Sequence, residues 1–189
     1  MSVAMEEEPR RHRITVDEYH RMAEVGLLAP DARVELIEGE IIDMPPMRSR
    51  HAAIVRRLTR LFERAIGDRA IVSCQLPLLL GDFSEPQPDV ALLVPREDCY
   101  QQRHPSAADT LLLVEVSETT LRYDRQTKLP LYARHGIPEV WIADTHDNRL
   151  HVFRKPSGAM YSEVLTPDLA SAASIESLPG IAVDLSSLL

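Results

Sequence analysis

Two short apolar runs, each joined to a carboxylate, decide the fold of this 189-residue chain: QPDVALLV at residues 87–94 and LLLVEVS at residues 111–117. Both runs have the length and aliphatic content of strands that are buried on both faces. Asp89 opens the first run and Glu115 closes the second. Carboxylates rarely lie against buried strands unless they are paired or hold a cation. Two acids on adjacent strands, with a lysine nearby, suit a divalent metal that activates water beside a phosphate.

Helical spacing and turn residues predict the elements around these strands. The clearest helix covers residues 49–66, where apolar side chains recur on one face, arginines occupy the other, and Gly67 ends it. Pro130 is tolerated only in a first helical turn, so the helix near residues 125–135 is predicted to start at Lys128 or Leu129. We also predict a helix over residues 15–24, capped by Thr15 and Glu18, and strands over 34–37, 41–42, 70–80, 140–143 and 149–154.

This order of elements predicts an α/β fold, with a mixed central β-sheet flanked by helices. The length fits a single domain, residues 14–189, after a flexible N-terminal segment, residues 1–13. Residues 95–109 are predicted to form a loop, and the tail after Pro167 is expected to cover an edge of the sheet.

Composition and charge narrow the class of protein. No apolar run approaches the length of about 18 residues that a membrane span requires. The charged N-terminus and the two cysteines, Cys74 and Cys99, which lack metal-ligand spacing, favour a cytoplasmic location. The net charge of −8 argues against a simple nucleic-acid binder, although seven arginines crowd residues 48–69. Charge alone leaves the partner undecided.

Several motifs together resemble a restriction-endonuclease-like family of the PD-(D/E)xK nuclease superfamily. The resemblance covers residues 16–153, and its motifs keep a specific order and spacing. In chain order they are ELIEGE at 35–40, PP at 45–46 with His51, QPDV at 87–90, VEVS at 114–117 with Thr120, Asp124 and Lys128, YA at 132–133, GIPE at 136–139 and WIAD at 141–144.

The resemblance implies a metal-dependent phosphodiesterase site at the edge of the sheet, with DNA as substrate and Mg²⁺ or Mn²⁺ as cofactor. It implies Asp89 and Glu115 as metal ligands. The superfamily's lysine two residues after the glutamate is absent, and Ser117 stands there. The resemblance implies that Lys128, from the following helix, substitutes for it. Homodimers are common among such nucleases, so a homodimer is expected by analogy.

Each candidate catalytic residue has a structural alternative. Asp89 can cap a loop, and Glu115 can belong to a buried ion pair. Lys128 is predicted to stabilise the phosphate or orient the attacking water, or else to pair with Asp124, which can itself cap a helix. Glu35, on the first hairpin strand, is predicted to supply a third carboxylate. Glu38 and Glu40 are its rivals, but their position at the turn favours solvent exposure.

Candidate DNA contacts lie on the helix of residues 49–66. His51 opens this helix, and Arg56, Arg57 and Arg60 lie on its polar side. Their side chains are predicted to contact DNA phosphates. The alternatives are a solvated helix face for the arginines and a structural role for His51. Trp141 and Tyr132 fall in apolar patterns and are predicted to be core residues.

Three functions are compatible with these observations. The first is a divalent-metal-dependent endonuclease that hydrolyses DNA phosphodiester bonds, that is, a Mg²⁺-dependent endodeoxyribonuclease. The second is a catalytically silent, nucleic-acid-associated or regulatory module that keeps the fold, which Ser117 and the acidic net charge favour. The third is a structural oligomer whose acids serve ion pairs. Metal binding distinguishes the first from the others.

Overall fold

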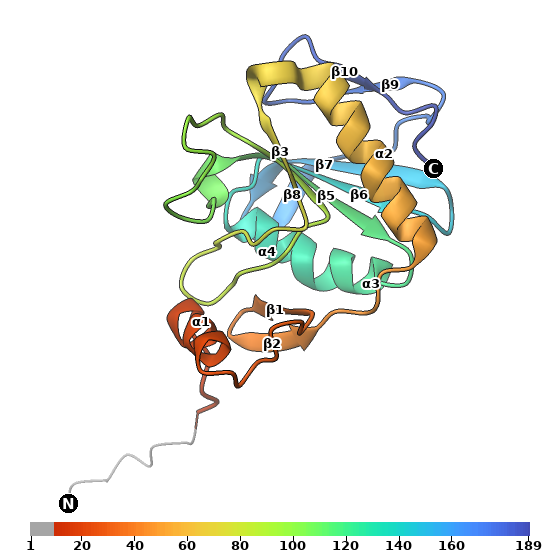
Figure 1. Cartoon of the computed structure of the whole chain (residues 1–189). Helices are drawn as coiled ribbons and strands as arrows, with labels where there is room; N and C mark the ends of the chain where they lie inside the picture. Colours follow the sequence, from red (N-terminus) through yellow and green to blue (C-terminus); the bar gives the residue numbers. More distant parts are fainter. Residues whose placement is uncertain (1–9) are drawn as a thin grey trace, which may run out of the picture.

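A mixed six-stranded sheet forms the centre of the molecule in the computed structural model, which describes residues 10–189 (Figure 1). The central pair, β5 and β6, is parallel, and the other neighbouring strands are antiparallel. In spatial order the strands are β3 (Ile71–Cys74), β4 (Val90–Leu93), β5 (Thr110–Ser117), β6 (Glu139–Asp144), β7 (Arg149–Ser157) and β8 (Met160–Leu165). The predicted α/β fold with a mixed central sheet is therefore confirmed.

Alternate residues of the strands enter two hydrophobic clusters, one on each face of the sheet. The first cluster joins the sheet to α2 (Ser49–Ile66) and to the C-terminal tail, which contains β9 (Ala172–Ser174) and β10 (Ala182–Asp184). The second cluster joins the opposite face to α4 (Leu129–Arg134). Ala91, Leu93 and Leu113 belong to this second cluster. Because every second residue of a strand lies on the same face, the residues two positions before Ala91 and after Leu113 also face α4.

A smaller unit lies below α3 (Leu121–Tyr123) in Figure 1, and consists of α1 (Val16–Glu24) and a hairpin of β1 (Val34–Ile37) and β2 (Glu40–Asp43). A third cluster holds it together, and Leu36, which is fully buried, exchanges main-chain hydrogen bonds with Glu85. The N-terminal segment 1–13 was predicted to be flexible, and its residues 1–9 lie outside the described residues. At the end of this segment, the guanidinium of Arg13 lies 4.2 Å from the ring centre of Phe83.

The elements with the clearest local signals form as predicted. Thr15 caps α1 through a capping box with Glu18, and α2 spans residues 49–66 and ends at Gly67. Glu38 and Gly39, both with positive φ, form the turn of the predicted hairpin. No helix among residues 10–189 is long and apolar enough to span a membrane.

The helix that contains Pro130 matches its prediction, whereas one predicted strand does not. The α-helix α4 begins at Leu129, as predicted, with the proline in its first turn, and a π-helical segment, Asp124–Lys128, together with α3 extends the helical run back to Leu121. Proline in a regular helix interior removes a hydrogen bond and clashes with the preceding turn, and the wider π turn accommodates it. The strand predicted over residues 70–80 ends at Cys74, because Gln75 takes a left-handed conformation with φ of 51°.

The C-terminal tail covers a face of the sheet, not the predicted edge. Its apolar residues pack beside α2 in the first cluster, and β8, which was not predicted, forms the outer edge. Glu139, which has no exposed surface, fixes the tail to the sheet: its carboxylate accepts hydrogen bonds from Trp141 Nε1 at 2.7 Å, Arg154 Nη2 at 2.8 Å and the main-chain nitrogen of Glu176 at 2.7 Å.

We predict that Arg154→Ala lowers the free energy of unfolding by about 3 kcal/mol, because it leaves the buried carboxylate of Glu139 without its counter-ion. Lys155→Ala is the matched control, because it removes only an exposed ion pair with Glu163 and should cost much less. Urea unfolding measures both. Equal losses for the two variants would contradict the role assigned to Glu139.

Candidate functional site

The register of β4 and β5 brings Asp89 and Glu115 side by side. Val90, the first residue of β4, pairs with Val114, so the next step of the antiparallel ladder places Asp89 beside Glu115. Residues directly opposite in such a ladder point to the same face, which here is the face covered by the helices of residues 121–134. Asp89 and Glu115 are 9% and 4% exposed. The structure therefore brings together the two acids predicted to be metal ligands.

Asp89 is held by three hydrogen bonds from different parts of the chain. Its Oδ1 lies 2.8 Å from His51 Nε2 and accepts a bond from Gln75 Nε2 at 3.1 Å. Its Oδ2 accepts a bond from the main-chain nitrogen of Val116 at 2.8 Å. The left-handed backbone of Gln75, a strained conformation for a non-glycine residue, turns the end of β3 onto this carboxylate. Asp89 is thus fixed in orientation, as a metal ligand or a structural link would be.

Lys128 lies between two carboxylates. Its Nζ is 3.1 Å from Glu35 Oε2 and 3.3 Å from Glu115 Oε1, and all three side chains are almost fully buried. Tyr132, four residues after Lys128 on the same helical face, donates a hydrogen bond of 2.5 Å to Glu115 Oε1. Lys128 does not form the alternative ion pair with Asp124; it joins β1, β5 and the π-helical segment.

Asp124 does not cap a helix, as one interpretation of the sequence had it. It lies inside the helical segment, and its Oδ2 accepts hydrogen bonds of 2.7 Å from the hydroxyls of Ser117 and Thr120. The capping position belongs to Thr120. Ser117, at the position where the superfamily has lysine, therefore orients a fourth carboxylate beside the site.

Burial and crowding of like charges dominate the electrostatics. Burial raises the pKa of Glu115 to about 8; Lys128 opposes this shift, and Asp124 and Asp89 add to it. Burial lowers the pKa of Lys128, but Glu115, Glu35 and Asp124 more than offset it, and the net shift is upward. The raised pKa values of Glu115 and Lys128 agree with one state of the site, in which Lys128 is charged beside Glu35 and Glu115 holds a proton. The site therefore carries more acid than its lysine can balance.

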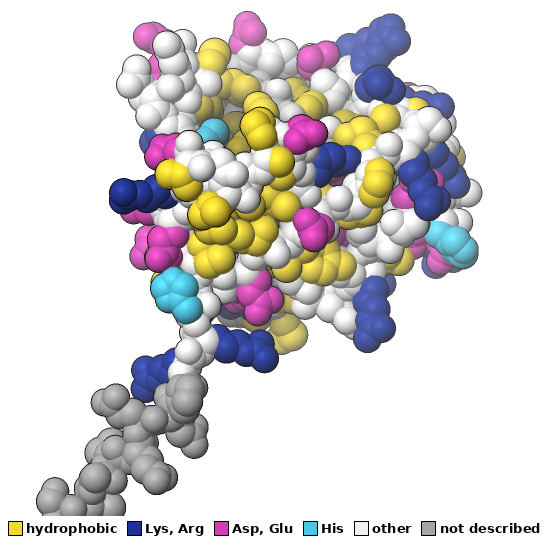
Figure 2. All heavy atoms as spheres, turned by 60° about the horizontal axis from the view of Figure 1, so that its bottom comes forward, with side chains coloured by type: hydrophobic (Ala, Val, Ile, Leu, Met, Phe, Trp, Pro, Cys, Tyr) yellow, Lys and Arg dark blue, Asp and Glu magenta, His cyan; other side chains and the backbone are white. Residues whose placement is uncertain are grey.

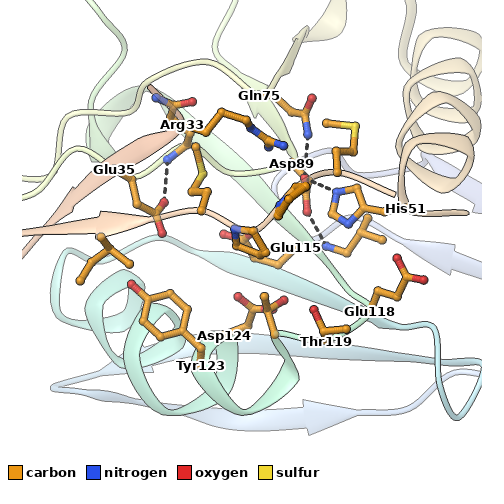
Figure 3. A pocket seen from close by; sticks show the side chains of 18 of the residues that line it. Arg33, Glu35, His51, Gln75, Asp89, Glu115, Glu118, Thr119, Tyr123 and Asp124 are labelled. Carbon is orange, nitrogen blue, oxygen red and sulfur yellow. Dashed lines mark hydrogen bonds and ion pairs between the residues drawn. The ribbon is translucent and has the colours of Figure 1, made fainter. Parts of the chain in front are cut away.

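These residues line a cavity of about 690 Å³. Figure 3 shows Arg33 and Gln75 on one side, Tyr123, Asp124, Thr119 and Glu118 on the opposite side, and Asp89 and Glu115 between them. The end of β2 and the loop after it form a further, mainly apolar part of the wall. Its apolar members in the lining are Ile42 of β2 and Met44, Pro45, Pro46 and Met47 of the loop.

The donor set partly fits a hard divalent cation. Mg²⁺ is typically held by one or two carboxylates together with water and phosphate oxygens, and Asp89 and Glu115 supply two adjacent carboxylates. Six acids line the cavity against three permanent cations, Lys128, Arg33 and Arg48, and one histidine, so an added positive charge would relieve the repulsion among the acids. The acids are Glu35, Asp43, Asp89, Glu115, Glu118 and Asp124. Within residues 10–189, no three His, Cys, Asp or Glu side chains are grouped closely enough to hold a metal ion by themselves.

Not all the candidate residues meet here. His51 contacts Asp89, and Glu35 reaches Lys128, but Arg56, Arg57 and Arg60 are exposed on the outer side of α2 and are not among the residues lining the cavity. Arg33 and Arg48 line it instead. Figure 2, which turns the side of α1 and the hairpin forward, shows Lys and Arg side chains spread around the edge of the face and not joined in one stripe.

Glu38 and Glu40 are exposed, as their position at the turn predicted, and are outside the lining; Glu38 pairs with Arg134 at 2.8 Å. Two residues that bond the acids of the site were not identified as such from the sequence. Tyr132, predicted only as a core residue, bonds Glu115, and Gln75 had no signal at all. Tyr123 lines the cavity, and its hydroxyl is enclosed without a hydrogen-bond partner among the described residues. Trp141 is a core residue, as predicted.

We predict that the contribution of His51 to stability depends on pH. The hydrogen bond to Asp89 is the main cause that raises the pKa of His51 above 6.5. The folded protein then binds the proton more tightly than the unfolded chain, so the stabilisation is complete below pH 6.5 and is lost as the pH rises through the raised pKa. His51→Gln should therefore cost about 1 kcal/mol more at pH 5.5 than at pH 9. Urea unfolding without divalent metal tests this, and a cost that grows with pH would contradict it.

The comparisons with known proteins agree with this architecture. One crystal structure, described as a putative nuclease belonging to DUF820 from Anabaena variabilis, superposes with a TM-score of 0.69 at 19% sequence identity, over 93% of this chain and 97% of that chain. At this identity the likeness shows the fold alone. No curated protein matches the chain. The model of the Uma2 family, described as "Putative restriction endonuclease", matches residues 16–186. The chain therefore belongs to the Uma2 family, which confirms the resemblance to restriction-endonuclease-like proteins.

Proposed function

We propose that the protein is a divalent-metal-dependent endonuclease that hydrolyses DNA phosphodiester bonds. The observation that carries this proposal is the meeting of Asp89, Glu115 and Lys128 in one cavity, from two strands and a helix. Membership of a family of restriction-endonuclease-like proteins supports it. The proposal includes Mg²⁺ or Mn²⁺ as the metal and DNA as the substrate.

Asp89 and Glu115 would hold Mg²⁺ or Mn²⁺. Such an ion supplies polarisation of the phosphodiester and a lower pKa for bound water. His51, Gln75 and the Val116 nitrogen hold Asp89 in orientation, and Tyr132 does the same for Glu115. Lys128 would offset the charge that develops on the phosphate, and Glu35 keeps this ammonium charged and in place.

One observation favours the catalytically silent alternative. Both oxygens of Asp89 already accept hydrogen bonds, and Oε1 of Glu115 is occupied by Tyr132 and Lys128. A permanently satisfied acid pair would keep the fold without binding metal, as the substitution of the usual lysine by Ser117 also suggests. Metal binding and cleavage separate the two functions.

We predict that Asp89→Asn and Glu115→Gln each abolish metal-dependent cleavage while the protein stays folded. Glu115→Gln is the sharper variant, because glutamine resembles the protonated Glu115 that burial favours at neutral pH. Its free energy of unfolding at pH 7 should lie within about 1 kcal/mol of wild type. Cleavage of a mixed-sequence DNA substrate with Mn²⁺, calorimetric titration with Mn²⁺ and urea unfolding give the three readouts.

Glu163→Gln, on exposed strand β8, is the matched control and should cleave like wild type. Wild-type protein that binds no divalent ion would overturn the nuclease proposal. A Glu115→Gln variant that unfolds would show that Glu115 serves the fold.

We also predict which arginines bind DNA. Arg33 and Arg48 line the cavity, so Arg33→Gln and Arg48→Gln should each weaken binding several-fold and reduce the salt dependence of log Kd by about one charge. The matched control is the triple variant of Arg56, Arg57 and Arg60 to glutamine, which changes more charge on the outer side of α2. Fluorescence anisotropy at several salt concentrations tests this. Loss of binding in the triple variant alone would restore the helix face as the contact surface.

A further inference from the structure

We propose that the cavity takes an unpaired nucleotide, so that the substrate is single-stranded or frayed DNA and not an intact duplex. The base would lie against the apolar wall formed by Met44, Pro45, Pro46 and Met47, while its phosphate faces Asp89, Glu115 and Lys128. This inference rests on the proposed nuclease function and names the substrate class for that site.

The depth at which Glu115 and Lys128 lie in the cavity supports this proposal. A volume of about 690 Å³ falls in the range of roughly 300–1,000 Å³ that is typical of small-ligand pockets. The groups that must reach the phosphate are recessed within it: Glu115 is 4% and Lys128 6% exposed. A phosphate of duplex DNA would have to enter the cavity together with the complementary strand and the neighbouring base pairs. A single strand can place one nucleotide in the cavity without this bulk.

The chemistry of the walls is the second argument. Neither a metal ion nor a phosphate needs an apolar wall, yet methionine and proline side chains line the cavity next to its acids. Met47 is 38% exposed, an apolar surface available to a partner. Methionine is flexible and its sulfur makes favourable contacts with aromatic rings, so this wall suits a base of any sequence. Tyr123, on the opposite side in Figure 3, adds an aromatic side chain to the lining.

The position of the positive charges is the third argument. Arg33 and Arg48 belong to the same lining as the apolar wall, so a strand whose base contacts the wall has cationic partners for its own phosphates. The exposed arginines of α2 are outside the cavity. Arg33 and Arg48 can therefore pair with the phosphates of a short stretch of one strand.

Binding without metal tests the inference independently of catalysis. A fluorescent ten-nucleotide DNA strand and the blunt duplex of the same sequence are titrated with protein in EDTA, and anisotropy gives the two Kd values. We expect the single strand to bind at least ten-fold more tightly than the duplex. Met44→Ser and Met47→Ser should each reduce this preference at least three-fold. Met160→Ser, which changes a methionine that is 73% exposed on edge strand β8, should leave it unchanged.

Cleavage with Mn²⁺ then separates this inference from the proposed function. Faster cutting of the single strand, with the preference reduced in the Met44→Ser and Met47→Ser variants, supports both. Equal binding and equal cutting of strand and duplex would overturn the inference and leave the nuclease function standing. A methionine-dependent preference for the single strand without any cutting would support the nucleotide pocket and overturn the nuclease function. Absence of binding to either DNA would overturn the inference.

Discussion

The ammonium of Lys128, buried between Glu35 and Glu115, is the interaction on which the rest of the site depends. Through this one cation it links the hairpin, the central sheet and the helix that covers the sheet. A buried ion pair gains little net stability, because desolvation of the two charges offsets their attraction. Two further acids, Asp89 and Asp124, lie beside this group in the same cavity. The excess of acid over permanent cations in the lining supports the proposal of a bound cation.

Sheet topology explains how two short motifs become one site. Asp89 and Glu115 lie at the ends of antiparallel neighbours, so the ladder register alone brings them together. The helix that follows β5 then supplies Asp124 and Lys128 through a π-helical segment, and Tyr132 one turn later. Such segments are frequent at functional sites, because the extra residue redirects side chains that a regular helix would aim elsewhere. The same segment connects α3 to α4, whose first turn contains Pro130.

The parts of the fold that follow from local chemistry could be read from the sequence. The capping box of α1, the turn at Glu38 and Gly39, and the apolar face of α2 each need only neighbouring residues to form. The same holds for Asp89 and Glu115, because they flank obvious strands. Gln75 and Tyr132 could not be identified, because a glutamine after a strand and a tyrosine in an apolar helix gain their roles only through partners distant in sequence. The polar face of α2 was also predicted correctly, and its arginines are exposed outside the cavity, so their contact with DNA stays a prediction.

A divalent ion held by Asp89 and Glu115 would replace the proton that burial favours on Glu115, and the protons released on metal binding reveal this exchange. Because burial raises the pKa of Glu115 to about 8, this carboxyl is mostly protonated at pH 7 in the metal-free protein. Coordination requires the carboxylate, so Mn²⁺ binding should release about one proton per site. Calorimetric titration at pH 7 in buffers of different ionisation enthalpy counts these protons. We expect wild type to release about one proton more than Glu115→Gln, or Glu115→Gln to bind no metal. The same release from both proteins, or no binding by wild type, would contradict this expectation.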